Sequence, residues 1–292
     1  MKMTQSKEFR PTPEQIPGQK LDYPAKQSDM TPQPDSDLSN YRAAGKLQGK
    51  VALITGGDSG IGRAVAIAYA MEGADIAIIY NQNDEDAETT RKVVEQKQQN
   101  CLKIKADVRN FAACKQAVEQ TINQYGKLNI LVNNAAYQMV QENFEDLSIE
   151  QFQRTIETNV YGYFYMVKAA LPYLQEDDAI INTGSIVGKI GKEFLIDYST
   201  SKGAVHTFTK SLALNLAERK IRVNAVVPGP VWTPNIPATM PKEMVDNFDK
   251  DAALKRAGQP EELAPAYVLL ASQDGSFITG ALVDVTGGQL SS

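Results

Sequence analysis

Short apolar runs alternate with longer amphipathic stretches from residue 50 to the end of the chain. The apolar runs have the length of strands and are hydrophobic at consecutive positions, which is typical of parallel strands buried on both faces. They lie at Lys50–Thr55, Asp75–Tyr80, Leu102–Ala106, Asn129–Val132, Ala179–Thr183, Ile221–Val226 and Leu282–Val285. The helical stretches lie at Gly60–Glu72, Asp84–Gln99, Phe111–Tyr125, Ser148–Leu174, Tyr198–Glu218 and Glu261–Ala271. The alternation predicts one α/β domain over residues 49–292, a doubly wound parallel sheet of about seven strands with helices on both faces.

The first 48 residues are more polar and richer in proline than the rest of the chain. They hold six of the 14 prolines, and only five residues of the Val, Ile, Leu and Phe types. Such a segment cannot by itself bury enough apolar surface to offset the entropy lost on ordering. Two interpretations stay open. The segment is a disordered tail, or it is an extended arm that lies on its own domain or on a neighbouring subunit, with Tyr23, Met30 and Tyr41 as anchors.

Composition and charge exclude some classes of protein but do not identify the function. The chain has 292 residues, 42% hydrophobic and 22% charged, which is ordinary for a globular protein. Its 30 basic and 35 acidic side chains leave no positive surplus for phosphate backbones, which argues against a nucleic-acid partner. No apolar run approaches the roughly 18 residues of a membrane span, and the N-terminus lacks the apolar core of a secretory signal. With only Cys101 and Cys114, we expect no disulfide framework and a cytoplasmic location.

Glycine-rich and polar stretches follow the predicted strands, at the edge of the sheet where open α/β folds bind ligands. The first strand leads into Thr55–Gly62, whose glycines allow a tight turn and close approach of a pyrophosphate to a helix N-terminus. The spacing is G-x-x-x-G-x-G, which is not that of a P-loop, and a glycine-rich connection without a ligand is the alternative. Later strand ends carry Asp107-Val108, Asn133–Ala136, Thr183–Ser185 and Pro228–Pro230.

Tyr198 and Lys202 are four residues apart at the start of a predicted helix and therefore share a face. Chance alone would give about one such pair in this chain, so the position after the strand ending in Ser185 carries the argument. The alternative is an ordinary buried tyrosine beside a solvated lysine. The single histidine, His206, lies four residues after Lys202, and we interpret it as a packing or solvent-facing residue. With one histidine, no metal site is predicted.

These residues together resemble the motifs of the short-chain dehydrogenase/reductase family. The resemblance covers about Leu47 to Gly288 and rests on TGGDSGIG, NNAA, Asn159, Ser185 with the Tyr198–Lys202 pair, and Pro228-Gly229, in that order. The extension before GKLQGKVALITGG is similar to that of stress-associated bacterial oxidoreductases. Ala136 stands where the family usually has glycine. We expect its extra methyl group to shift the loop slightly, without removing the backbone and side-chain polar atoms of the motif. The resemblance implies a Rossmann-like fold and an NAD(P)-dependent enzyme.

The resemblance also implies catalytic roles for four residues. Tyr198 would be the general acid/base, Ser185 would hydrogen-bond the substrate oxygen, and Asn159 would hold a water that links Lys202 to solvent. An ordinary tyrosine, with a pKa near 10, is too weak a base at neutral pH. The Lys202 ammonium and an oxidised nicotinamide would both lower that pKa. Lys202 would also bind the nicotinamide ribose.

The expected cofactor contacts cluster at the same strand ends. They are Gly56, Asp58, Ser59, Gly60, Ile61, Gly62, Tyr80, Asn81, Asp107, Val108, Asn133, Ala135, Thr183, Tyr198, Lys202, Pro228, Gly229, Val231 and Thr233. Three acids, Asp84, Glu85 and Asp86, follow the second strand, and the nearest cation is Arg63 inside the next helix. NADP needs a cation for its 2′-phosphate, so this pattern favours NAD over NADP.

The expected substrate contacts are Tyr137, Ser185, Tyr198 and Trp232, with the proline-containing segment 231–254 as a lid. The sequence predicts an oxidoreductase that interconverts an alcohol and a carbonyl on a small molecule, either a sugar or polyol or an aldehyde or ketone. A 3-oxoacyl carrier-protein reductase is less favoured, because an acidic protein would not attract an acidic carrier. A non-catalytic dinucleotide sensor or scaffold is the alternative from another class. The resemblance implies a homotetramer formed through the two long helices.

Overall fold

Seven parallel strands form one sheet in the order β3-β2-β1-β4-β5-β6-β7. They are β1 (Val51–Thr55), β2 (Asp75–Tyr80), β3 (Cys101–Lys105), β4 (Ile130–Asn133), β5 (Ala179–Thr183), β6 (Arg222–Pro228) and β7 (Leu282–Val285). The structure, a computed structural model, describes residues 10–250 and 252–289. The strand order reverses between β1 and β4, which opens a crevice at the carboxyl ends of these strands. The predicted doubly wound sheet is confirmed.

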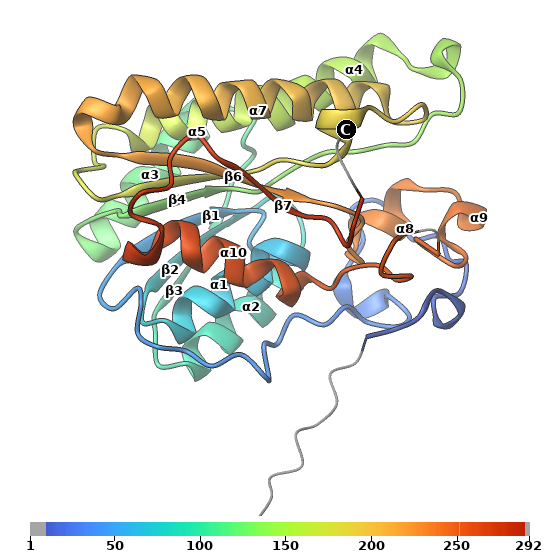
Figure 1. Ribbon diagram of the computed structural model, residues 1–292. Helices are drawn as coiled ribbons and strands as arrows, with labels where there is room; N and C mark the ends of the chain where they lie inside the picture. Colours follow the sequence, from blue (N-terminus) through green and yellow to red (C-terminus); the bar gives the residue numbers. More distant parts are fainter. Residues whose placement is uncertain (1–9, 251, 290–292) are drawn as a thin grey trace, which may run out of the picture.

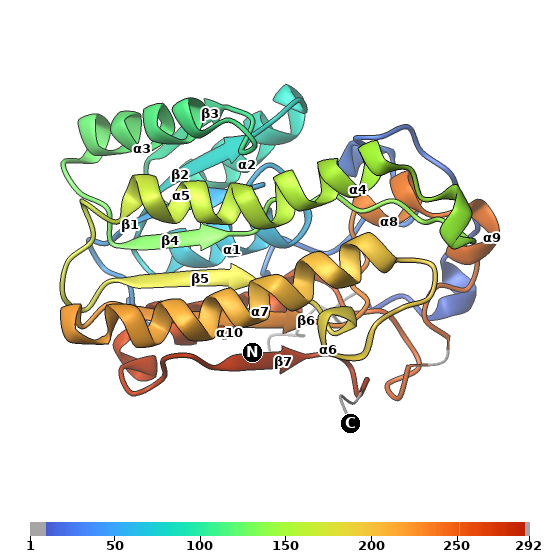
Figure 2. The ribbon, with the colours of Figure 1, turned by 90° about the horizontal axis from the view of Figure 1, so that it is seen from above.

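Helices cover both faces of the sheet (Figures 1 and 2). Successive strand residues point to opposite faces, so Ile54 packs against one layer of helices, whereas Leu53 packs against the other. The first layer holds α1 (Gly60–Met71), α2 (Asp84–Gln96) and α10 (Pro260–Ala271). The second holds α3 (Phe111–Tyr125), α5 (Gly162–Ala170) and α7 (Ile196–Leu216). No helix of residues 10–250 or 252–289 is long and apolar enough to cross a bilayer.

The helix expected over 148–174 consists of several parts. α4 (Ile149–Ile156) is capped by Ser148, whose Oγ accepts from the Gln151 N–H at 3.0 Å. A π-helical turn over Glu157–Tyr161 then leads into α5, which ends at Ala170. Pro172 has no N–H to continue the helix. π turns inside α-helices are frequent at functional sites, and this one contains Asn159.

Three short helices lie beyond the carboxyl edge of the sheet. They are α6 (Val187–Ile190), α8 (Asn235–Thr239) and α9 (Lys242–Val245). α8 and α9 belong to the segment that the sequence analysis interprets as a lid. Figure 1 shows them beside the blue N-terminal segment of the chain.

Residues 10–48 lie against the rest of the chain. Ile16 and Met30 are buried in a cluster with Trp232 and Ile236, and Leu38 and Leu47 pack into the core beside α1. We call residues 10–48 the N-terminal arm. Of the three expected anchors, Met30 is buried, the Tyr41 hydroxyl contacts the Glu72 carboxylate, and Tyr23 packs edge-on against Tyr137. Residues 1–9 lie outside the described part of the chain.

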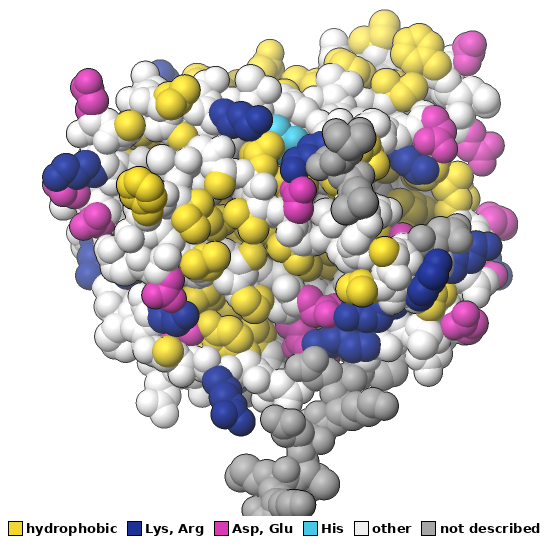
Figure 3. Space-filling model, viewed as in Figure 1, with side chains coloured by type: hydrophobic (Ala, Val, Ile, Leu, Met, Phe, Trp, Pro, Cys, Tyr) yellow, Lys and Arg dark blue, Asp and Glu magenta, His cyan; other side chains and the backbone are white. Residues whose placement is uncertain are grey.

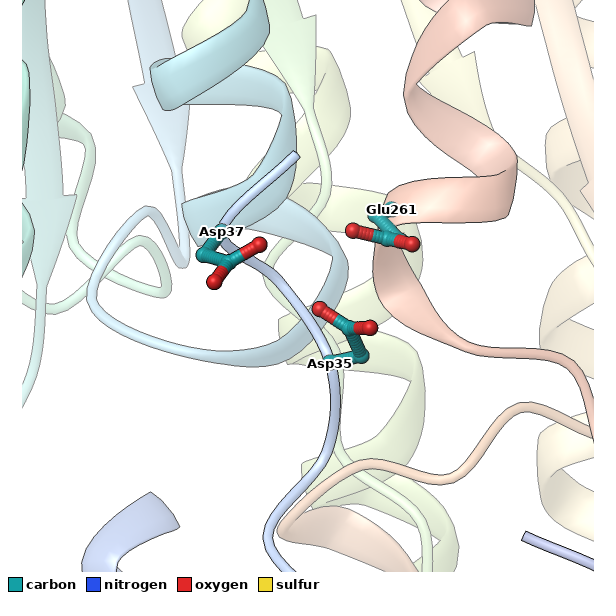
Figure 4. A group of neighbouring side chains, drawn as sticks. All are labelled: Asp35, Asp37 and Glu261. Atoms are coloured by element: carbon teal, nitrogen blue, oxygen red, sulfur yellow. The ribbon is translucent and has the colours of Figure 1, made fainter. Parts of the chain in front are cut away.

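A cluster of charged side chains attaches the arm to the start of α10. Figure 4 shows Asp35 and Asp37 of the arm beside Glu261. Arg10 donates to Glu261 at 2.6 Å and to Asp35 at 3.2 Å, and Glu261 also accepts from the Leu38 N–H. Burial raises the pKa of Glu261 to about 7. The guanidinium of Arg10 therefore pairs with two of the three carboxylates, those of Asp35 and Glu261.

Candidate active site

A cavity of about 760 Å³ lies at the carboxyl ends of the strands. Its walls come from the loop after β1, the ends of β2 to β6, the start of α7, the segment around α8 and α9, and the N-terminal arm. All these parts are distant in sequence, and the parallel sheet brings them to one edge. The cavity is therefore at the position where open α/β sheets bind their ligands.

The loop between β1 and α1 requires glycine for steric reasons. Gly56 has a φ of 63° and Gly60 a φ of 51°, a backbone region that favours glycine. A Cβ atom on Gly62 would lie 2.0 Å from the Gly56 carbonyl oxygen. The amide of Asn134 donates to the carbonyls of Thr55 and Gly56, both at 3.1 Å, and fixes the loop from the β4 side. This tight loop at the N-terminus of α1 fits the pyrophosphate of a dinucleotide.

Most of the expected cofactor residues line the cavity, and two do not. The lining ones are Gly56, Asp58, Ser59, Gly60, Ile61, Tyr80, Asn81, Asp107, Val108, Ala135, Thr183, Tyr198, Lys202, Pro228, Gly229, Val231 and Thr233. Gly62 lies behind the loop and allows its turn. Asn133 is fully buried and donates to the Asn182 side chain at 2.9 Å, because its side chain points along the sheet to the neighbouring strand. Sequence reasoning missed the structural role of Asn134.

Ser185, Tyr198 and Lys202 meet at the cavity, from the end of β5 and the first turns of α7. Burial raises the pKa of Tyr198 to about 12, and a hydrogen bond with the Ser185 side chain acts in the opposite direction. Lys202 is fully buried; its Nζ donates to the Thr183 carbonyl at 2.7 Å and lies 5.5 Å from the centre of the Tyr198 ring. Burial lowers the pKa of Lys202 to about 7. A hydroxyl, a phenol and an amine therefore share one desolvated corner.

Asn159 does not line the cavity but holds its wall. Its Oδ1 accepts from the Tyr137 N–H at 2.7 Å, and its Nδ2 donates to the Tyr137 carbonyl and to Ser201 Oγ, both at 2.9 Å. The side chain thus ties the loop after β4 to α7, one residue before Lys202. These contacts assign Asn159 a positioning role. The water relay to Lys202 stays a prediction.

His206 is buried, in agreement with the packing interpretation, and it also contacts Ser185. The residue is 5% exposed, and its Nε2 accepts from the Ser185 N–H at 3.3 Å. Burial, together with the charge of Lys202, lowers the pKa of His206 to about 4, so that the ring is neutral at physiological pH. The sequence indicated that His206 lies near the site, because it follows Lys202 by four residues, and residues four apart on a helix share a face.

Of the two aromatic residues expected to contact a substrate, Tyr137 lines the cavity and Trp232 does not. The Tyr137 ring lies under the guanidinium of Arg154, 4.2 Å from the ring centre, and beside Tyr23. Trp232 is completely buried outside the cavity; its Nε1 donates to the Pro32 carbonyl of the arm at 2.8 Å, and its ring packs near Phe248. Trp232 therefore connects the arm to the segment around α8 and is not a substrate contact.

The three acidic residues whose position suggested NAD form ion pairs outside the cavity. Asp84 pairs with Lys105 and Glu85 with Lys26, at 2.6 and 2.7 Å. Arg63 donates to Asp86 at 2.8 Å, and neither these three acids nor Arg63 line the cavity. The cavity wall after β2 consists instead of Asn81, Gln82 and Asn83, with Asp58 from the glycine-rich loop. Burial raises the pKa of Asp58 to about 6.

Comparisons with known proteins show the family of the chain. A family model described as enoyl-(acyl carrier protein) reductase matches residues 56–289. General stress protein 39 of Bacillus subtilis is 50% identical over 277 residues, 94% of this chain and 97% of that protein. Glucose and ribitol dehydrogenase of Daucus carota is 43% identical over 283 residues, 94% of this chain and 97% of that protein. A short chain dehydrogenase from Burkholderia cenocepacia in complex with NADP is 32% identical, with a TM-score of 0.79, over 83% of this chain and 98% of that one.

The matches cover nearly all of the sheet and its helices, and they include a stress protein and dehydrogenases, as the motifs indicated. The resemblance inferred from the glycine-rich loop and the Ser185, Tyr198 and Lys202 set is thereby confirmed. The chain belongs to the short-chain dehydrogenase/reductase family and is an oxidoreductase with a dinucleotide-binding fold.

Proposed function

We propose that the protein interconverts an alcohol and a carbonyl on a small molecule, with Tyr198 as the general acid/base. The observation that carries the proposal is the meeting of Ser185, Tyr198 and Lys202 in one desolvated corner of the cavity. A bound nicotinamide dinucleotide would supply the two-electron acceptor or donor, as a hydride. Its pyrophosphate would lie at the glycine-rich loop, and Lys202 would hold the nicotinamide ribose.

Tyr198, Ser185 and Lys202 would have different roles at the substrate oxygen. In alcohol oxidation, Tyr198 as phenolate takes the hydroxyl proton while the carbon loses a hydride; in carbonyl reduction, the phenol returns that proton. Without substrate, the Ser185 hydroxyl bonds to Tyr198 and favours its phenolate; with substrate bound, the single proton of Ser185 would be donated to the substrate oxygen instead. The positive charge of Lys202 favours that phenolate, in opposition to the burial that raises the pKa.

Within this reaction class we favour a sugar or polyol over a simple aldehyde or ketone. Polar side chains such as Gln138, Asn235 and Asn247 line the cavity together with apolar ones such as Met244. A polyol offers several hydroxyls to such a wall, and the carrot relative is named for glucose and ribitol. The test is a panel of polyols, sugars and aldehydes assayed with both dinucleotides by nicotinamide absorbance. Turnover of aldehydes alone would contradict the polyol assignment.

A 3-oxoacyl carrier-protein reductase is the second candidate, because a 3-ketoacyl-(acyl-carrier-protein) reductase from Brucella melitensis is 34% identical over 83% of this chain. An acyl carrier protein is acidic, whereas this chain has a net charge of −5. Charge repulsion disfavours that encounter. A carrier-bound substrate added to the same panel decides between the two, since a carrier-protein reductase would process it faster than any polyol.

We propose that NAD is preferred over NADP, because Asp58 lines the cavity together with residues 81–83 of the loop after β2. Asp58→Asn is expected to raise the ratio of NADPH to NADH affinity about tenfold, since one negative charge facing the 2′-phosphate is removed. Fluorescence titration at pH 7.5 measures both affinities. The control Asp177→Asn removes a charge from an exposed turn and is expected to change neither. Equal ratios in wild type and Asp58→Asn would contradict the role of Asp58.

We also propose a homotetramer built on two apolar surfaces. Figure 3 shows hydrophobic side chains gathered over α10 and β7, where Phe277 is fully exposed. On the other helical layer, Tyr161, Phe164 and Leu214 are exposed by 50, 45 and 82%. Two separate self-complementary surfaces generate a closed tetramer.

Light scattering is expected to give a particle four times the 32.0 kDa chain mass. Leu214→Asp and Phe277→Asp are each expected to halve that mass, because a buried unpaired carboxylate disrupts one surface and leaves the other. A 32.0 kDa particle for the wild type at micromolar concentration would refute the tetramer.

A further inference from the structure

Residues 23–25 of the N-terminal arm form part of the cavity wall, and residues 26 and 27 attach them to the loops beside it. Tyr23, Pro24 and Ala25 line it together with Asp58, Ser59 and Gly60 of the glycine-rich loop. We call residues 23–27 the strap. The strap precedes the first strand by more than twenty residues, and it belongs neither to the glycine-rich motif nor to the proposed catalytic residues.

Gln27 anchors the strap to the two loops beside it. The side chain is 4% exposed, and its Oε1 accepts from the Gly60 N–H at 2.9 Å. The Gln27 backbone N–H donates to Asp86 Oδ2 at 2.9 Å. One arm residue thus joins the N-terminus of α1, where a pyrophosphate would bind, to the first turn of α2.

The strap also holds the loop after β2 in place. This loop would contact the ribose of the adenosine. Asn83 Nδ2 donates to the Ala25 carbonyl at 2.9 Å, and Lys26 pairs with Glu85 at 2.7 Å. Asn83 itself lines the cavity. The loop therefore keeps its place through contacts with the arm rather than through the sheet alone.

Tyr23 extends the strap toward the middle of the cavity. Its ring packs edge-on against Tyr137, with ring centres 5.4 Å apart, and the Arg154 guanidinium lies 5.5 Å from its centre. Tyr23 remains 37% exposed although it is held on two sides. A half-exposed aromatic ring in a cavity wall offers an apolar face to a ligand.

We propose that the strap is part of the dinucleotide site: it closes the adenosine diphosphate half of the cavity, and Tyr23 contacts the bound dinucleotide. The inference rests on the proposed use of NAD or NADP. It adds that affinity for the dinucleotide depends on a segment outside the sheet and its helices.

The experiment compares Tyr23→Ala with the matched variant Tyr41→Ala in full-length protein. Tyr41 lies on the same arm, outside the cavity lining, and contacts Glu72. NADH is titrated by nicotinamide fluorescence, and ADP-ribose, which lacks the nicotinamide, is titrated as its competitor. Tyr23→Ala is expected to weaken both about tenfold, whereas Tyr41→Ala stays within twofold of the wild type.

The outcomes separate the inference from the proposed function. A wild type that binds neither NADH nor NADPH refutes the proposed function itself. If the wild type binds NADH and Tyr23→Ala binds it equally well, the proposed role of the strap is refuted. The role is also refuted if Tyr41→Ala loses as much affinity as Tyr23→Ala. A loss for NADH without a loss for ADP-ribose overturns the assignment to the adenosine half. Melting temperatures of both variants are compared, and Tyr23→Leu replaces Tyr23→Ala if the latter does not fold.

Discussion

Tyr198→Phe is expected to lower kcat about a thousandfold, while the affinity for NADH stays within twofold of the wild type. The phenyl ring keeps the packing of the corner, but it has no proton to give to, or take from, the substrate oxygen. Positioned acid–base groups contribute on the order of a hundred- to ten-thousandfold to rate. Steady-state kinetics with the best substrate of the panel, together with NADH fluorescence titration, provides the two measurements.

Tyr125→Phe is the matched control for this substitution. Its hydroxyl donates to the Ile76 carbonyl at 2.9 Å, outside the cavity, so that loss of this hydroxyl is expected to leave kcat unchanged. An undiminished kcat in Tyr198→Phe would sink the proposed mechanism. A non-catalytic sensor predicts a different pattern, with dinucleotide binding but no turnover in the wild type.

Lys202→Met is expected to lower kcat about a hundredfold and to move the pH profile of alcohol oxidation upward. Oxidation needs the phenolate of Tyr198, whose pKa burial raises to about 12. The ammonium form of Lys202, which predominates below its own pKa of about 7, would favour that phenolate. Removing that charge moves the rise in rate to higher pH. Lys210→Met, an exposed site two turns further along α7, is the control and keeps the wild-type profile.

The stability of the protein without cofactor gives an independent readout for Lys202. Burial lowers its pKa to about 7 in the folded state, whereas the unfolded chain keeps this proton up to the ordinary value of 10.5. Between these two pH values the unfolded state binds more protons, so the contribution of Lys202 to the free energy of unfolding rises with pH. Denaturant titrations from pH 7 to 10 are expected to show a smaller rise in Lys202→Met than in the wild type. Parallel curves would contradict a buried, poorly solvated amine.

Local patterns were sufficient to predict the sheet and to bring Tyr198 and Lys202 to one face of a helix. Continuous apolar runs such as Asp75–Tyr80 are strands because both faces are buried, and this can be read without knowing the partner strands. The helix ends were less predictable: the helix expected to reach Gln99 ends at Gln96, shortly before Gln98 adopts a φ of 65°. Tyr198 and Lys202 share a face because helical geometry fixes neighbours four residues apart.

Side-chain partners from distant segments could not be predicted in this way. The acids Asp84, Glu85 and Asp86 suggested a negative cavity wall, yet each pairs with a cation from another element. Trp232 looked like a substrate contact, but a proline carbonyl some two hundred positions earlier accepts its N–H. Such pairings depend on which chain segments meet in three dimensions, and one-dimensional spacing does not encode that.

The sequence by itself therefore determined the family, the doubly wound parallel sheet and the glycine-rich loop, because short motifs and apolar runs depend on short-range geometry. The tertiary structure alone decided the placement of the N-terminal arm, the positioning contacts of Asn159 and His206, and the pKa values of Tyr198 and Lys202. Burial and hydrogen bonding set these properties, and both arise only when residues far apart in the chain are packed together.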